Sequence, residues 1–181
     1  MKFILLLIFM IGLLPSRGPK DFDFRVQLAQ AIVAVTDDDV EQLTLVRLAK
    51  YESGFRRNVA RCETHAQGAT MKTEDHGKSF GTFQVQPMSK ADAKLACGSL
   101  VEQAGLALRY MRRSAEMCPK NKGAATLNLY TSGRCDYGLK QSEERWGGQD
   151  IKDGVFVIPS LPSNASGFPA NDNDVKKVAN D

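Results

Sequence analysis

The segment Tyr51-Glu52-Ser53-Gly54-Phe55 contains the side chain best suited to acid–base chemistry. Glu52 falls in the last turn of a predicted helix, near the negative end of the helix dipole, and its aromatic neighbours would shield it from water. Both effects disfavour the charged carboxylate and raise its pKa, as a general acid working near neutral pH requires. A glutamate before a helix-ending glycine is also common on solvated surfaces, so this segment alone leaves both interpretations open.

Three further segments contain residues that could line a binding cleft beside Glu52. Residues 75–85 form a glycine-punctuated turn that runs into an alternating polar and apolar stretch. Tyr110 lies on a predicted helix, and Tyr130 opens the segment 130–133. Taken singly, each of these aromatic residues is as typical of a hydrophobic core as of a ligand contact.

Together the four segments resemble the motifs of the lysozyme-like lytic transglycosylases and, within the same superfamily, the goose-type lysozymes. Their catalytic Glu-Ser at a helix end is matched by Glu52-Ser53, and their Gly-Leu-Met-Gln-aliphatic motif by residues 81–85. The fourth motif, Ala-Ala-Tyr-Asn-Ala-Gly, is matched in part by residues 130–133, with Thr131 in place of Asn. The goose-type lead-in, Asp-x-Gly-x-x-Phe-Gly, is matched by Asp75, Gly77, Phe80 and Gly81. The third motif, a small residue followed three positions later by Tyr and an aliphatic residue, is matched by Ala107, Tyr110 and Met111. The resemblance covers roughly residues 40–135.

The resemblance implies a mainly α, lysozyme-like α+β fold, in which a small irregular or β lobe lies beside an active-site cleft. It also implies an enzyme that cleaves the β-1,4 bond between N-acetylmuramic acid and N-acetylglucosamine in peptidoglycan, giving 1,6-anhydro-muramyl products. Glu52 would first protonate the glycosidic oxygen as charge builds on an oxocarbenium-like centre. The same carboxylate would then draw the muramyl 6-hydroxyl onto the anomeric carbon, so a second carboxylate is not required.

The substrate-binding residues follow from the same resemblance. Ser53 would steady the Glu52 carboxylate or a substrate acetamide, although capping the helix is its simpler role. Gln84 would donate to an N-acetyl group from the cleft floor, and Phe83 is expected to bind the substrate as well. Tyr110 and Tyr130 would place their rings and hydroxyls along the groove. Nothing in the sequence demands a metal or an organic cofactor.

Asp75 separates two mechanisms. Facing Glu52 at about 6.5–9.5 Å, it would position a water molecule and make the protein a hydrolase of the goose-type lysozyme kind. If it only caps the turn before Gly77, the transglycosylase mechanism stands. Glu63 and Glu74 are weaker candidates for a second carboxylate. The partly matched fourth motif keeps open a third hypothesis, in which the protein binds peptidoglycan without cleaving it.

Size and charge agree with a single globular domain that does not bind nucleic acid. The chain has 181 residues, 43% of them hydrophobic and 25% charged, with a net charge of +3. Its basic residues are scattered among 21 acidic ones rather than clustered in a stripe, which argues against a nucleic-acid partner. A weakly basic surface would still be attracted to an anionic cell-wall polymer.

The N-terminal residues 1–18 are expected to be a signal peptide or a short anchor. Lys2 precedes an apolar run from Phe3 to Leu14, which is shorter than the roughly 20 residues of a membrane span. Because no small-x-small triplet precedes Arg17, the segment could remain attached and associate with a membrane. The alternative is a buried helix of the fold. We therefore expect an exported protein of the periplasm or cell envelope, or of a virion; partners in secretion, conjugation or virion assembly stay open.

The four cysteines fit an exported chain with two disulfides. Four cysteines allow three pairings. Cys118 and Cys135 bracket one helix-sized segment, which favours pairing them and pairing Cys62 with Cys97. The rival interpretation, a zinc site using Cys62 with His65 and His76, lacks a second closely spaced ligand pair.

Hydrophobic spacing places most of the domain, residues 21–150, in helices. Helices are expected from Asp21 to the Asp37-Asp38-Asp39 break and from Val40 to Glu52. A capping box at Ser99 begins the clearest helix, whose core face is expected to hold Leu100, Ala104, Ala107, Leu108, Met111 and Ala115. Further helices are expected over 89–98, 123–132 and 139–146, with an irregular lobe over 56–88. Residues 151–181 are rich in Pro, Ser and Asn and are expected to be a loose tail.

Overall fold

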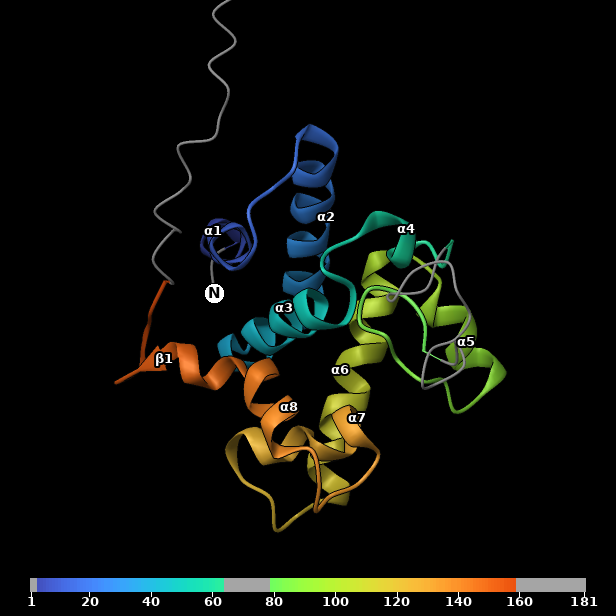
Figure 1. Ribbon diagram of the computed structural model, residues 1–181, viewed down its shortest axis with the longest axis vertical. Coiled ribbons are helices and arrows are strands. Elements are labelled where there is room, and N and C mark those ends of the chain that lie inside the picture. The colour runs from blue at the N-terminus through green and yellow to red at the C-terminus, as the bar shows by residue number, and fades with distance from the viewer. Residues whose placement is uncertain (1–2, 64–78, 159–181) are drawn as a thin grey trace, which may run out of the picture.

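Eight α-helices make up most of the described chain, and a short hairpin follows them, so the predicted mainly helical class is confirmed. The computed structural model describes residues 3–63 and 79–158 (Figure 1). The longer helices are α1 (Phe3–Leu13), α2 (Pro19–Val35), α3 (Asp39–Ser53) and α6 (Leu100–Met117). The shorter ones are α4 (Arg57–Ala60), α5 (Lys90–Ala96), α7 (Asn128–Ser132) and α8 (Leu139–Arg145), with 3-10 turns η1 (Gly123–Leu127) and η2 (Gly147–Asp150).

The core lies where α2, α3 and α6 pack on one another. In Figure 1, α6 runs through the molecule from the side of α4 and α5 to that of α7 and α8. The fully buried side chains at this junction come from all three helices; they include Leu28, Ile32, Leu43, Leu48, Ala104 and Ala107. Burial of this apolar surface is what holds α3, and with it Glu52, in place.

The ends of α3 and α6 are fixed by the capping residues that the sequence indicates. The Asp38 side chain accepts from the Glu41 amide at 2.8 Å and so begins α3. Gly54, with a φ of 60°, ends α3 in the left-handed conformation that favours glycine. At α6, Ser99 and Glu102 form the expected capping box. The positions of these ends are therefore determined locally.

The core face of α6 differs in part from the prediction. Ala104, Ala107, Leu108 and Met111 are buried as expected, but Ala115 is exposed. Ser114 takes the inward position instead, where its hydroxyl donates to the Thr126 carbonyl at 2.5 Å. Near its end, α6 is therefore joined to the backbone of η1 by a polar side chain.

Helix α1 packs against α2 and α3. Its Leu6, Phe9 and Met10 side chains are fully buried. Arg25 of α2 is itself buried and donates to the carbonyls of Leu14 and Pro15, just after α1 ends. This packing agrees with the alternative interpretation of residues 1–18, in which the segment is a buried helix of the fold. A role of the segment in export stays a prediction.

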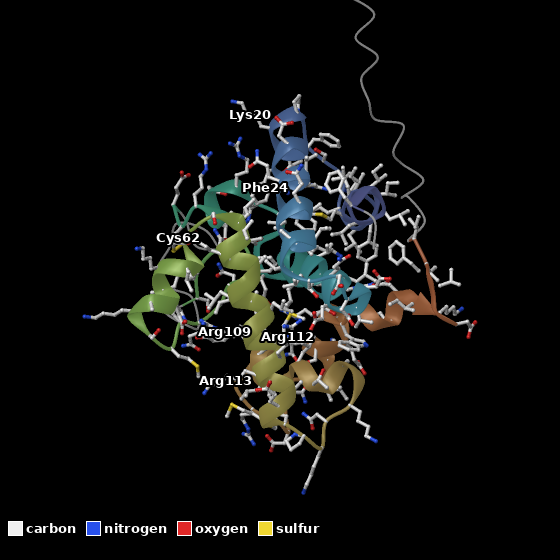
Figure 2. All side chains as sticks on the ribbon, turned by 180° about the vertical axis from the view of Figure 1, so that it is seen from behind. Lys20, Phe24, Cys62, Arg109, Arg112 and Arg113 are labelled. Atoms are coloured by element: carbon white, nitrogen blue, oxygen red, sulfur yellow. A yellow bond between two sulfur atoms is a disulfide. The ribbon has the colours of Figure 1, made fainter. Side chains whose placement is uncertain are left out.

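Two disulfides join the predicted partners, Cys62 with Cys97 and Cys118 with Cys135, at S–S distances of 2.05 and 1.96 Å. The first, at Cys62 in Figure 2, links the end of α4 to the end of α5, and the second links the end of α6 to the loop after α7. Between the first pair, an isolated antiparallel bridge joins Phe80 to Val85 in the expected irregular lobe. Both disulfides therefore fasten loops that border α6.

Beyond Asp150, where the sequence predicts a loose tail, a short antiparallel hairpin pairs β1 (Ile151–Lys152) with β2 (Val155–Phe156). The Phe156 ring packs edge-on against Phe9, with the ring centroids 5.3 Å apart. The folded part thus extends at least to this hairpin.

Over the described ranges, none of the helices combines the length and apolar character needed to cross a membrane.

Candidate active site

Glu52 lies in the last turn of α3, and its carboxylate faces α8. The Nε of Arg145, the last residue of α8, donates to Glu52 Oε1 at 2.6 Å. The two side chains keep 15% and 21% of their surface exposed, so the ion pair is largely shielded from water. The Arg145 guanidinium also lies 5.5 Å from the centre of the Tyr51 ring and donates to the Gln141 carbonyl. Glu52 is therefore held in one orientation rather than being a freely solvated surface residue.

Two opposing effects set the proton affinity of Glu52. Burial disfavours the charged carboxylate and raises its pKa above the ordinary value, while the positive charge and hydrogen bond of Arg145 lower it. Burial is the larger effect. A glutamate with a raised pKa keeps its proton closer to neutral pH, which is the property that a general acid needs.

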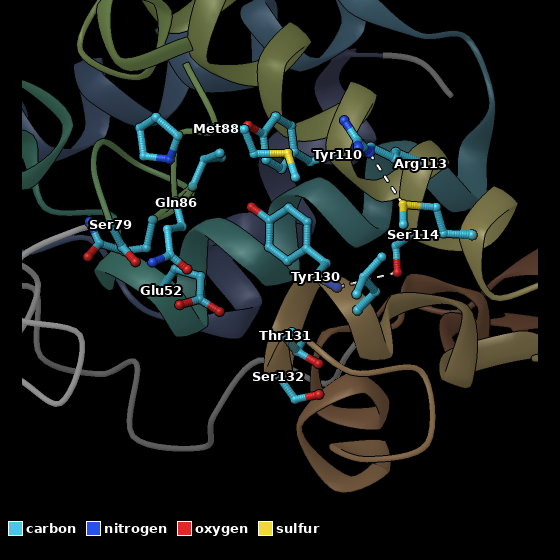
Figure 3. A pocket seen from close by; sticks show the side chains of 16 residues that line it. Glu52, Ser79, Gln86, Met88, Tyr110, Arg113, Ser114, Tyr130, Thr131 and Ser132 are labelled. Carbon is cyan, nitrogen blue, oxygen red and sulfur yellow. Dashed lines mark hydrogen bonds between the residues drawn. The ribbon is translucent and has the colours of Figure 1, made fainter. Parts of the chain in front are cut away.

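Two cavities meet at Glu52. One, of about 710 Å³, extends toward α6 and α7 and is lined by Tyr110 and Tyr130; we call it the tyrosine cavity. The other, of about 560 Å³, lies on the α8 side. Glu52, Ser79 and Gln84 line both, so the carboxylate is at their junction. Figure 3 shows the Glu52 side chain pointing toward the space that Ser79 and Tyr130 border. Among the described residues, Glu52 is the only carboxylate that lines either cavity.

The turn that carries Gln84 is fixed by a glutamine of α6. Gln103 Oε1 accepts from the Thr82 amide at 2.8 Å, while Gln103 Nε2 donates to the carbonyls of Ala60 and Gly98 at the same distance. Gln84 itself has a φ of 46°, rare for a residue other than glycine, and its Nε2 donates to the Gly81 carbonyl at 2.9 Å. Such backbone conformations persist where surrounding contacts over-determine them, often at functional sites.

Tyr110 and Tyr130 form walls of the tyrosine cavity (Figure 3). The Tyr130 hydroxyl donates to the Phe83 carbonyl at 2.8 Å, which ties α7 to the Gln84 turn. Burial, followed by the negative charge of Glu52, raises the pKa of Tyr130 well above its usual range, so its hydroxyl stays protonated. The Tyr110 hydroxyl donates to Asp92 and accepts from the Met88 amide, both at 2.9 Å. Both rings are therefore fixed rather than free to rotate.

The structure brings most of the predicted site residues together, but two of them hold different positions. Ser53 lines the cavity on the α8 side, but its hydroxyl is buried and donates to the Ala49 carbonyl at 2.8 Å, a contact within the helix rather than with the Glu52 carboxylate. The Phe83 ring is 1% exposed and belongs to the core. Phe83 contributes its backbone carbonyl to the site, not its ring.

The candidates for a second carboxylate are placed as follows. Asp75 and Glu74 lie outside the described residues. Glu63 is exposed and pairs with Arg61 at 3.7 Å, away from both cavities.

The zinc alternative also rests on residues outside the described ranges, His65 and His76, and its third member Cys62 is in a disulfide. In residues 3–63 and 79–158, no cluster of three metal-ligating side chains is found.

The threonine of the fourth motif has a structural partner. The Thr131 hydroxyl pairs with the Ser142 hydroxyl at 2.9 Å, and Ser142 also donates to Asn128 Oδ1 at 2.8 Å. These contacts join α7 to α8, the helix that ends in Arg145. Thr131 lines the tyrosine cavity as well. The departure from the family motif therefore coincides with a hydrogen-bonded link between the two helices beside Glu52.

Sequence reasoning missed Arg145 and Ser79. Arg145 is 93 residues from Glu52 along the chain, and an arginine in the last turn of a helix is explained by the helix dipole alone. Ser79 lies in the family-like segment 75–85 but corresponds to no motif residue.

No family model, curated protein or solved structure shows significant similarity to this chain.

Proposed function

We propose that this protein is a peptidoglycan lytic transglycosylase with Glu52 as its acid/base. The observation that carries the proposal is the position of Glu52, a largely buried carboxylate with a raised pKa at the junction of two open cavities. A strand that crosses this junction would present a glycosidic oxygen to Glu52 with sugars on both sides. A polymer strand is long enough to occupy both cavities at once, with its scissile bond at Glu52.

The reaction needs one group that first gives and then takes a proton. Glu52 protonates the glycosidic oxygen, and the bond from that oxygen to the muramyl anomeric carbon breaks. The resulting carboxylate then removes the proton of the muramyl 6-hydroxyl, whose oxygen bonds to the anomeric carbon and closes the anhydro ring. Glu52 ends the cycle protonated. Because Arg145 holds Oε1, we assign both proton transfers to Oε2.

The other side chains of the cleft would orient the sugars. Gln84 lines both cavities, so its amide can reach a substrate acetamide next to the scissile bond. Tyr130 lies in the tyrosine cavity with its hydroxyl tied to Phe83, and its ring would pack on a sugar face. The attraction of Arg145 for the ionised Glu52 would stabilise the carboxylate that forms once the glycosidic oxygen is protonated.

The two disulfides support export as part of the proposal. Disulfides form and persist in oxidising compartments such as the periplasm and the cell exterior. Peptidoglycan is reached from that side of the membrane. The proposed substrate and the proposed location therefore agree.

Digestion of purified sacculi by the full chain, followed by mass spectrometry of the released muropeptides, tests the proposal. The full chain is required because α1 contributes to the core. We expect anhydro-ended products, and we expect Glu52→Gln to lower their rate of release by about 10²–10⁴-fold, the range for loss of a general acid. Circular dichroism would establish that the variant is folded.

Two results would contradict the proposal. Hydrated, reducible ends would identify a hydrolase and direct attention to Asp75 as the residue that positions water. Binding to sacculi without any soluble product from the folded wild type would identify a glycan-binding protein.

A further inference from the structure

The cavity on the α8 side of Glu52 is lined by four cations, Arg17, Lys50, Arg56 and Arg145, and we call it the cationic cavity. Glu52 is its only carboxylate in the described part of the chain. The tyrosine cavity, by contrast, has Arg113 as its only described cation against the same Glu52. Positive charge is therefore concentrated on one side of the proposed scissile bond, although the chain as a whole carries a net charge of only +3.

The four cations come from separate parts of the chain. Arg17 follows α1, Lys50 is on α3, Arg56 follows α3, and Arg145 ends α8. Arg56 is held by a 2.9 Å hydrogen bond from its Nε to the Ser53 carbonyl. Their convergence is thus a property of the tertiary structure and not of one charged helix face, which is the usual explanation for a run of basic residues.

Little within the described chain neutralises this charge. Arg145 pairs with Glu52 and, at 3.6 Å, with Glu144. Lys50 lies 4.5 Å from the centre of the Tyr51 ring, a contact that attracts a cation without cancelling its charge. No described carboxylate forms an ion pair with Arg17, Lys50 or Arg56. A partly enclosed cavity with excess cations concentrates anionic ligands.

We propose that the cationic cavity binds carboxylates of the stem peptide carried by the muramyl residue at the scissile bond. This inference rests on the proposed function. The sugar rings of a peptidoglycan strand offer neutral hydroxyl and acetamide groups, whereas the stem peptide attached through the muramyl lactyl group carries free carboxylates. Because the cavity adjoins Glu52, a stem held there keeps its own muramyl unit at the acid/base. The enzyme is accordingly selective for peptide-substituted strands over bare glycan.

A double variant, Arg17→Gln with Lys50→Met, tests this selectivity. Neither side chain donates a hydrogen bond to another described residue, so the substitutions remove charge without removing a side-chain hydrogen bond; the contact of Lys50 with the Tyr51 ring is lost together with the charge. The matched control is Lys122→Gln with Lys140→Met, which removes the same charge from exposed residues outside both cavities. Each full-length protein is assayed on two substrates. One is peptide-substituted glycan strands, and the other is the same strands after an amidase has removed their peptides. Both preparations are free of phosphodiester polymers.

We expect the wild type to cleave peptide-substituted strands with the higher kcat/KM. The double variant should lose about tenfold in kcat/KM on these strands, because each partly exposed charge pair contributes a few-fold. It should keep its rate on stripped strands, and the control should keep both rates. The preference of the wild type should also shrink as the salt concentration rises.

The outcomes separate this inference from the proposed function. Equal cleavage of both substrates by the wild type, or an equal loss in the double variant and the control, would overturn the inference and leave the proposed function standing. A loss on stripped strands as large as on substituted ones would also overturn it. Cleavage of neither substrate by the folded wild type would overturn both.

Discussion

Replacing Gly81 by alanine tests whether the Gln84 turn is fixed by its neighbours. Gly81 has a φ of 74°, and a Cβ there would lie 2.1 Å from the Ala96 carbonyl oxygen and 2.8 Å from Gln103 Oε1. Gly133 has the same φ of 74°, but a Cβ there would meet nothing within 4 Å. The pair therefore separates the cost of the left-handed backbone, about 1–2 kcal/mol for either alanine, from the cost of the clash.

The clash acts through the hydrogen bonds of Gln103. Its amide makes three bonds of 2.8 Å, to Thr82, Ala60 and Gly98, and the new methyl group cannot be accommodated without moving that amide or the backbone at Ala96. At about 1 kcal/mol for each bond, we expect Gly81→Ala to lose about 3 kcal/mol more than Gly133→Ala. That difference is a large fraction of the 5–15 kcal/mol that stabilises a typical domain.

Urea unfolding followed by circular dichroism, with the disulfides intact, measures the difference as a shift in midpoint at constant slope. Glycan cleavage is measured on the same preparations, and Gly81→Ala should also reduce it, because Gln84 follows three residues later. Free energies of unfolding that agree within about 1 kcal/mol would refute the account of Gln103 as the residue that fixes this turn.

Two further predictions concern Arg145 and α1. Because Arg145 lowers the pKa of Glu52 against the effect of burial, Arg145→Gln should raise that pKa further. In the pH profile of kcat/KM on bare glycan, the alkaline limb, along which Glu52 loses its proton, should then move to higher pH. Arg145→Lys should move the limb back in part. A limb that does not move in Arg145→Gln would contradict the assignment of Glu52 as the acid. Phe9→Ala should lower the free energy of unfolding by about 3–5 kcal/mol, because the Phe9 ring is fully buried. Its control is Ile8→Ala, at a residue 37% exposed, and equal losses in the two variants would show that α1 does not pack as described.

Features determined by local interactions were predictable from the sequence. The capping box at Ser99 and the helix end at Gly54 depend on a few neighbouring residues, and both form as expected. The position of Glu52 at the end of α3 follows from the same signals. The disulfide pairs were also predictable, because Cys118 and Cys135 bracket one helix-sized segment and Cys62 is then left to pair with Cys97.

Features that depend on distant segments were not predictable. Nothing near Arg145 in the sequence points to Glu52, and the meeting of the four cations requires the packing of α1, α3 and α8 to be known. The apolar run of α1 has no helical period, so the sequence does not distinguish an export signal from a buried helix. Ser53 shows the same limit at one residue, because a serine beside a catalytic glutamate does not reveal whether its hydroxyl turns to the helix or to the cleft.

The contact between Phe9 and Phe156 has a consequence for the order of folding. The first described helix and the last described strand touch, so this part of the core closes only after nearly the whole described chain has left the ribosome. Contacts between residues so far apart in sequence form late and slow folding, because the intervening chain must be ordered first. Until then the Phe9 ring lacks its partner on the hairpin, so part of the apolar surface of α1 stays exposed on the nascent chain.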